Sequence, residues 1–206
     1  MHLIVYMIYY ETINNFERKR MKKVILIIAV LLTTMHGYTQ TKMPAIDKSP
    51  LDMAYYPVNY PVLKIQNKLQ EPLIARVIYS RPQKNGRKIF GELIEFDKVW
   101  RLGANEATEI EFFQNVKVGD AKVKKGRYTL YAIPSSTEWT VIINKENDTW
   151  GSFNYDEKKD VARIKLPVQK QSTTSENLVM TFSKSGSGFA LMMAWDDILV
   201  SLPITL

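Results

Sequence analysis

Short runs of alternating apolar and polar residues, separated by turn residues, constrain this chain more than any other feature of its sequence. The runs are rich in Val, Ile, Tyr, Phe and Thr, and turn signals such as Asn85-Gly86 and Gly119-Asp120 lie between them. They occupy residues 73–80, 109–112, 128–133, 139–144, 161–166, 178–182, 189–195 and 198–202. This spacing predicts about nine short strands in an all-β antiparallel sandwich or jelly roll, with a closed barrel as the alternative.

The N-terminal region has the composition of an export signal. Two basic residues, Lys22-Lys23, precede the nine-residue apolar run Val24–Leu32. A helix that spans a bilayer needs about 20 apolar residues, so this run is too short to cross one. The order of charge, apolar run and polar segment predicts a signal peptide over residues 21–40. We expect cleavage between Gly37 and Thr41.

The rest of the chain divides accordingly. Residues 1–20 are interpreted as a start-site extension outside the fold, and the alternative is an uncleaved anchor built from two short apolar pieces. Residues 41–61 are predicted to form an extended arm, and residues 62–206 the single β-sandwich domain. After processing we expect no stable membrane span and a periplasmic or extracellular location.

The missing residue types exclude several kinds of chemistry. The chain has no cysteine, and its two histidines, His2 and His36, lie in the N-terminal region. A Ser-His-Asp triad, a cysteine nucleophile and a Cys/His zinc site are therefore excluded from the folded part, and we expect no metal and no cofactor. The +7 charge of the chain falls to +4 in residues 41–206, which hold 23 basic and 19 acidic residues. Without a clustered basic stripe, nucleic-acid binding is not expected.

The densest group of chemically capable side chains lies between two predicted strands. Trp100, Arg101, Asn105 and Glu106 occur within seven positions. An indole stacks on sugar rings, a guanidinium binds carboxylates or hydroxyls, and an amide or carboxylate orients hydroxyl groups. A structural interpretation remains open: Trp100 fills the core, and Arg101 pairs with an acidic residue such as Glu106.

Three further residues complete the candidate site. Arg81 and Lys88 lie in a segment predicted to fold as a hairpin around Asn85-Gly86, where they form an anion site or a solvated turn. Trp150 lies beside Gly151 in an aromatic segment that lines a binding face or packs into the core. A glycine at position 103 suggests a positive φ angle within the Trp100 loop.

The sequence therefore favours a binding module over an enzyme. The expected ligand is a glycan or another polar component of the cell envelope. One alternative is a hydrolase that uses paired carboxylates on an envelope polymer, and a second is a structural partner that pairs through a sheet edge. The sequence does not indicate an oligomeric state.

A series of motifs, in order along the chain, resembles a bacterial family of unknown function, the domain numbered 2911. These motifs are Arg81-Pro82, Gly86–Gly91, Val99–Thr108, Gly126-x-Tyr128, Ile133-Pro134, Trp139–Val141 and Trp150-Gly151. The resemblance extends from about Ala54 to the C-terminus and implies export and a single domain, but no activity. Leu102 departs from the family pattern, in which a small polar residue is common at this position.

Overall fold

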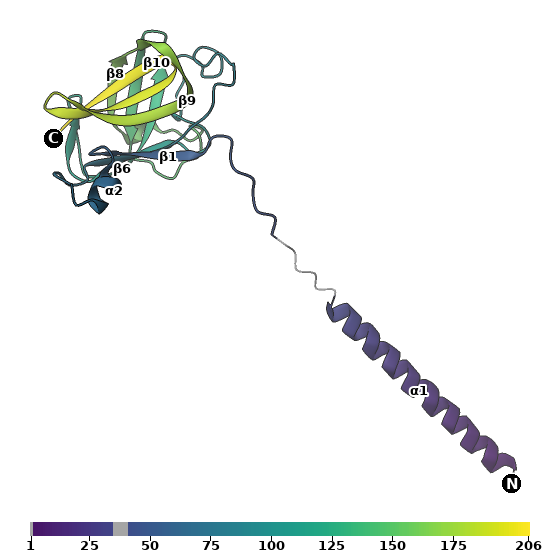
Figure 1. Ribbon diagram of the computed structural model, residues 1–206. Coiled ribbons are helices and arrows are strands. Elements are labelled where there is room, and N and C mark those ends of the chain that lie inside the picture. Colours follow the sequence, from purple (N-terminus) through teal and green to yellow (C-terminus); the bar gives the residue numbers. More distant parts are fainter. Residues whose placement is uncertain (1, 35–40) are drawn as a thin grey trace. The chain divides into compact units, whose positions relative to one another are not determined.

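Two antiparallel sheets form where the sequence alternates, and they pack face to face in the computed structural model (Figure 1). The six-stranded sheet has the order β1 (Leu51–Tyr56), β2 (Ala75–Ser80), β3 (Thr108–Phe112), β6 (Gly126–Pro134), β7 (Glu138–Asn144) and β8 (Asp160–Pro167). The four-stranded sheet has the order β5 (Ala121–Val123), β4 (Val116–Val118), β10 (Gly188–Thr205) and β9 (Gln169–Ser185). The predicted all-β sandwich is confirmed.

The structure describes residues 2–34 and 41–206, and the chain divides into one unit of residues 1–45 and a β-rich unit of residues 46–206. In the first unit a single helix, α1, covers His2–Thr34. No helix in the described ranges is both long and apolar enough to cross a membrane. The expected cleavage point falls on residues 35–40, outside the described residues, so the signal peptide stays a prediction.

Aromatic rings form the centre of the core between the two sheets. Trp100 lies 5.7 Å from Trp139 in an edge-to-face arrangement and is stacked 6.1 Å from Trp195. Phe90 closes the group, with its ring 5.1 Å from that of Trp139. Edge-to-face and offset rings attract one another beyond the gain from area burial. A chain without disulfides is thus held together by apolar packing.

The last three predicted runs form two long strands instead of three short ones. Strands β9 and β10 have 17 and 18 residues. Their pairing shifts register on both sides of Asp196, where the apolar and polar residues cease to alternate. Two three-residue strands, β4 and β5, were not predicted. Each is too short to show an alternating pattern of its own.

Part of the predicted arm belongs to the six-stranded sheet. Strand β1 pairs along its whole length with β2, from Leu51 opposite Ser80 to Tyr56 opposite Ala75. A short helix, α2 (Tyr60–Ile65), follows, and a 3₁₀ helix, η1 (Glu157–Lys159), precedes β8. The sequence of β1, Leu-Asp-Met-Ala-Tyr-Tyr, has no clear period of two, so alternation did not indicate this strand.

The hairpin predicted around Asn85-Gly86 is wrong. This segment turns at Gly86 but does not fold back on β2, because its backbone pairs with β9 instead. Lys84 N–H donates to Glu176 O at 2.7 Å, and Leu178 N–H donates to Pro82 O at 3.1 Å. Residues 81–99 therefore form an irregular connection of turns and isolated bridges.

Candidate functional site

Two loops that are distant in sequence join on the outer side of the six-stranded sheet. Ala107 N–H donates to Thr149 O at 3.0 Å, and Gly151 N–H donates to Asn105 O at 2.9 Å. These bonds make Glu106 and Trp150 opposite partners in a short antiparallel bridge. Two of the predicted site residues are thereby brought together, on a backbone fixed by hydrogen bonds from both sides.

The second loop presents two aromatic rings to solvent. Trp150 is 61% exposed and Phe153 is 82% exposed. Between them Gly151 has a φ of +69°, and a Cβ at this position would lie 2.6 Å from Phe153 Cε2. Only glycine allows both this backbone and this approach of the ring. The local sequence Trp-Gly-x-Phe therefore builds a pair of exposed rings.

Beside Trp150 lies a cavity of about 310 Å³ with three carboxylates on its wall. Its lining residues are Leu51, Ile78, Glu106, Ala107, Glu109, Asp148, Thr149 and Trp150. Its floor is apolar and its charged side chains are all acidic. Such a concave surface, with an aromatic wall and a few polar groups, is typical of small-ligand sites.

The three carboxylates differ in their partners. Arg127 binds Asp148 at 2.6 Å and Glu109 at 3.4 Å, and the backbone N–H of Asp148 also donates to Glu109 Oε1 at 2.9 Å. Glu106 is exposed, and within the described residues its carboxylate has neither an ion-pair nor a hydrogen-bond partner. Its oxygens are therefore free to accept hydrogen bonds from a ligand.

Tyr155 anchors the far end of the Trp150 loop. Its ring lies edge-on to that of Tyr131, with centroids 5.1 Å apart. The Tyr155 hydroxyl donates to Asp160 Oδ2 at 2.6 Å and accepts from Arg163 Nη2 at 2.6 Å. Burial and the bond to Asp160 raise the pKa of Tyr155 to about 12. The loop is thus held at both ends.

The Trp100 loop has a different character. Trp100 is in the core, and its indole N–H donates to Gly103 O at 3.1 Å. Thr108 Oγ1–H donates to Leu102 O at 2.8 Å, which closes the loop from the other side. Leu102 is fully buried, so its departure from the family pattern lies in the core and not on an open surface.

Arg101 is half-buried, and among the described residues its guanidinium has no ion-pair or hydrogen-bond partner. Its Nε is buried without a hydrogen-bond partner, and burial lowers the pKa of its guanidinium. The pairing with Glu106 that the structural interpretation suggested does not form in the described part of the chain. Asn105 contributes its backbone oxygen to the bridge with Gly151 and has a φ of +59°.

Gly103 is required for close approach and not for a positive φ. Its Cβ would lie 2.7 Å from Ser80 Oγ, which is hydrogen-bonded to Ala104. The positive φ angles of this loop belong to Leu102, at 55°, and to Asn105, so the expectation for Gly103 is wrong.

Arg81 and Lys88 lie apart from Trp150. Arg81 Nη1 donates to Asp52 Oδ2 at 3.0 Å, in a cleft lined by residues of β1 and β9. Lys88 lines another cavity, of about 480 Å³, and forms an exposed ion pair with Glu92 at 3.3 Å. The residues predicted as one site are thus dispersed. Trp100 is in the core, three different cavities hold the others that line one, and Arg101 and Asn105 line none of these three.

Sequence reasoning missed several residues of the Trp150 cavity. Glu109 and Asp148 are carboxylates without a distinguishing motif, and Leu51 comes from the segment predicted as an arm. Phe153 does not line this cavity, and it belongs to the aromatic segment that the sequence indicated as a binding face or a part of the core. Throughout residues 2–34 and 41–206, no group of three or more His, Cys, Asp or Glu residues could hold a metal ion.

The comparison with protein families gives one match. Residues 61–204 match the family described as "Protein of unknown function (DUF2911)", which confirms the resemblance seen in the sequence. No curated protein and no solved structure matches the chain.

Proposed function

Because the chain belongs to the DUF2911 family, whose function is unknown, we propose from its own geometry that it is an exported module that binds a glycan. The observation that carries this proposal is the exposed pair Trp150 and Phe153 beside a cavity whose free carboxylate is Glu106. The proposed ligand is a neutral oligosaccharide of the cell envelope.

The exposed rings favour a sugar over a compact ionic ligand. Single exposed apolar side chains are common, but Trp150 and Phe153 expose two rings together on a loop fixed by backbone hydrogen bonds, and such clustering favours an interaction surface. A sugar ring presents C–H groups on one face and hydroxyls at its edge. The exposed indole of Trp150 would stack on the C–H face of the sugar, while the Glu106 carboxylate accepts hydrogen bonds from the hydroxyls at its edge.

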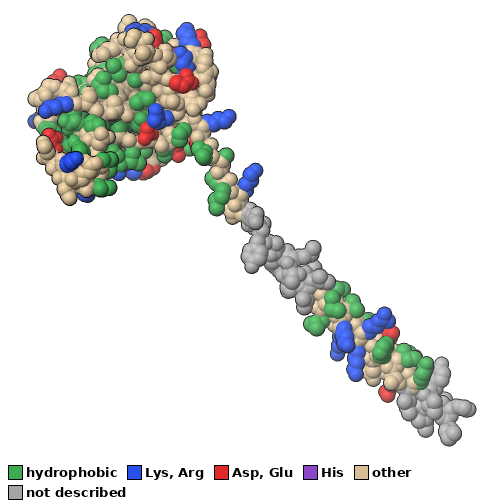
Figure 2. Space-filling view, in the orientation of Figure 1, with side chains coloured by type: hydrophobic (Ala, Val, Ile, Leu, Met, Phe, Trp, Pro, Cys, Tyr) green, Lys and Arg blue, Asp and Glu red, His purple; other side chains and the backbone are tan. Residues whose placement is uncertain are grey.

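The charges of the cavity limit the kind of sugar. All three charged side chains on its wall are acidic, and Arg127 compensates two of them. Glu106 would repel an acidic sugar and accept hydrogen bonds from neutral hydroxyls. Basic and acidic side chains are interspersed on the face of the β-rich unit that Figure 2 shows, with no basic stripe for a polyanion.

Binding is favoured over hydrolysis for the same reason. Glycoside hydrolysis uses two carboxylates that flank the scissile bond and act as acid and base or nucleophile. Glu109 and Asp148 are both occupied by Arg127, so Glu106 stands without a free second carboxylate on this wall.

Export is the part of the proposal that rests on the N-terminal region. The basic pair Lys22-Lys23 before the apolar run Val24–Leu32 supports it. N-terminal sequencing of the protein recovered from the periplasm or the medium tests it. A new N-terminus between Gly37 and Thr41 is expected, and an intact N-terminus on exported protein contradicts the signal peptide.

Isothermal titration calorimetry with defined oligosaccharides tests the glycan site. The probes are cellohexaose, chitohexaose and xylohexaose, titrated into the full chain. We expect at least one to bind. Trp150→Ala should weaken that binding about five- to thirtyfold, since loss of a stacked ring costs on the order of 1–2 kcal/mol. Glu106→Gln should weaken it less, because the amide oxygen still accepts.

Ile65→Ala is the matched control, since Ile65 is an 85% exposed apolar residue on α2, outside the Trp150 cavity. It should bind as the wild type does. If none of the oligosaccharides binds, or if Trp150→Ala binds as tightly as Ile65→Ala, the proposed glycan site is abandoned.

A further inference from the structure

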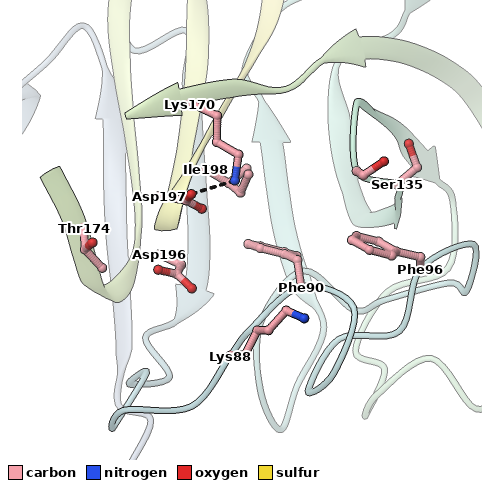
Figure 3. A pocket seen from close by; sticks show the side chains of 10 residues that line it. Lys88, Phe90, Phe96, Ser135, Lys170, Thr174, Asp196, Asp197 and Ile198 are labelled. Atoms are coloured by element: carbon pink, nitrogen blue, oxygen red, sulfur yellow. Dashed lines mark hydrogen bonds and ion pairs between the residues drawn. The ribbon is translucent and has the colours of Figure 1, made fainter. Parts of the chain in front are cut away.

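The cavity that contains Lys88 carries charges of both signs around an aromatic wall (Figure 3). It measures about 480 Å³ and is lined by Lys88, Phe90, Phe96, Ser135, Ser136, Lys170, Thr174, Asp196, Asp197 and Ile198. Four separate segments of the chain contribute to it. The glycan proposal uses none of these residues.

A β-bulge places two consecutive carboxylates in this cavity. On a regular strand neighbouring side chains point to opposite faces. Here Trp195 and Ile198 are both in the core, and the pairing with β9 shifts on either side of Asp196, which has a φ of +56°. Asp196 and Asp197 therefore both line the cavity. Bulges of this kind re-aim side chains and are frequent next to functional sites.

The ion pairs of the cavity divide into one partly buried pair and two exposed pairs. Lys84 binds Asp196 at 2.5 Å, with side chains 23% and 15% exposed. By contrast, Lys170 binds Asp197 at 2.6 Å with side chains 65% and 44% exposed. The Lys88 side chain is 67% exposed in its pair with Glu92. Exposed pairs contribute little stability, so a ligand can exchange with them at small cost.

We propose that this cavity binds a small zwitterion, such as a free α-amino acid or a short peptide with an apolar side chain. The ligand ammonium replaces Lys170 on Asp197, and the ligand carboxylate binds the released Lys170 and Lys88. Asp197 and Lys170 each keep a partner in this exchange, while Lys88 shares or gives up its exposed pair with Glu92. A ligand that carried only an ammonium would take Asp197 and leave Lys170 without a charged partner, whereas a zwitterion supplies a partner to both.

The aromatic wall selects the side chain of that ligand. Phe90 is half-buried, with its ring edge-on to Trp195 at 6.3 Å, so the aromatic core holds it in place. Phe96 is 36% exposed at the other side of the cavity, and Figure 3 shows both rings facing the same space as Lys88. An apolar or aromatic side chain would gain contact area there.

Calorimetry of the full chain with three dipeptides tests the proposal. The probe is alanyl-phenylalanine, and the comparisons are its N-acetylated form, which lacks the ammonium, and its C-terminal amide, which lacks the carboxylate. We expect the zwitterion to bind. Each blocked form should bind at least about tenfold more weakly, because each loses one charge-assisted hydrogen bond. Asp197→Asn should weaken binding of the zwitterion by a similar factor.

Two variants separate this site from the rest of the molecule. Asp120→Asn removes an acidic group from the exposed turn between β4 and β5 and should leave dipeptide binding unchanged. Trp150→Ala should also leave it unchanged, so failure here and failure of the glycan site are distinguishable. No binding of the zwitterion, equal binding of the blocked forms, or an Asp197→Asn variant that binds as the wild type overturns the proposal.

Discussion

The loops that carry Trp100 and Trp150 are neighbours joined by backbone hydrogen bonds, yet they use the same side chain in opposite ways. Trp100 is 5% exposed, and its indole nitrogen is satisfied within its own loop. Trp150 is 61% exposed and lines a cavity. Glycine and polar residues surround both tryptophans in the sequence. The local composition therefore does not show which tryptophan is in the core and which is on the surface.

The two tryptophans differ in exposure because they lie on opposite faces of the six-stranded sheet. Trp100 pairs with Ala132 through its backbone and enters the core between the two sheets. Trp150 pairs with Glu106, whose exposed side chain marks the outer side. One residue stabilises the fold, and the other is available to a ligand. Substitutions in the two loops should therefore affect different properties.

The largest effect is expected for Trp100→Ala. Removal of a buried indole from a ring cluster leaves a cavity and should lower the free energy of unfolding by about 3–5 kcal/mol. Urea denaturation followed by circular dichroism measures this. Trp100→Phe is the control, which keeps a ring and should lose less. A loss below about 1 kcal/mol for the alanine variant would mean that Trp100 is not a core residue.

An intermediate effect is expected for Tyr155→Phe, which tests whether the exposed loop is held firmly. The substitution removes the hydroxyl between Asp160 and Arg163, but these two remain paired through Arg163 Nε at 2.7 Å. The expected loss in the free energy of unfolding is therefore about 1 kcal/mol at neutral pH. Denaturant unfolding of both proteins at the same pH gives this difference.

The pH dependence of that difference has a definite sign. The folded-state pKa of Tyr155 is raised to about 12, above the value near 10 in an unfolded chain. Its stabilising contribution is complete below the unfolded value and is lost as the pH rises through the folded one. The gap between wild type and Tyr155→Phe should therefore narrow from pH 10 to 12, and a gap that widens contradicts the assigned hydrogen bonds.

The smallest effect on stability is expected for Trp150→Ala. Because the indole is 61% exposed, its loss should change the free energy of unfolding by less than about 0.5 kcal/mol, while the glycan binding proposed above should fall. Thermal unfolding of the variant beside Trp100→Ala makes the comparison direct. A Trp150→Ala variant as unstable as Trp100→Ala would remove the distinction between the two loops.

Much of the fold was predictable from alternation alone. The runs at residues 73–80, 128–133 and 139–144 became β2, β6 and β7 because each has enough residues to show a period of two. Strand β1 was missed because its sequence has no clear period, and β4 and β5 because each has only three residues. The two long strands were read as three because the bulge at Asp196 interrupts the alternation.

The candidate site was less predictable. Glu106 and Trp150 were both named, and their pairing depends on a bridge between loops more than 40 positions apart, which no local pattern encodes. Arg81 was placed near them but binds Asp52 on the first strand. Tertiary pairing, and not residue type, decides which polar side chains share a cavity.

Because only one of the four indoles is exposed, the intrinsic tryptophan fluorescence of the protein can report on that one side chain. Trp100, Trp139 and Trp195 are at most 5% exposed, whereas Trp150 is 61% exposed. Acrylamide should therefore quench mainly the red-shifted part of the fluorescence emission, which belongs to Trp150. A molecule that covers this ring will shield it from the quencher, so occupancy of the cavity can be followed in solution without any label.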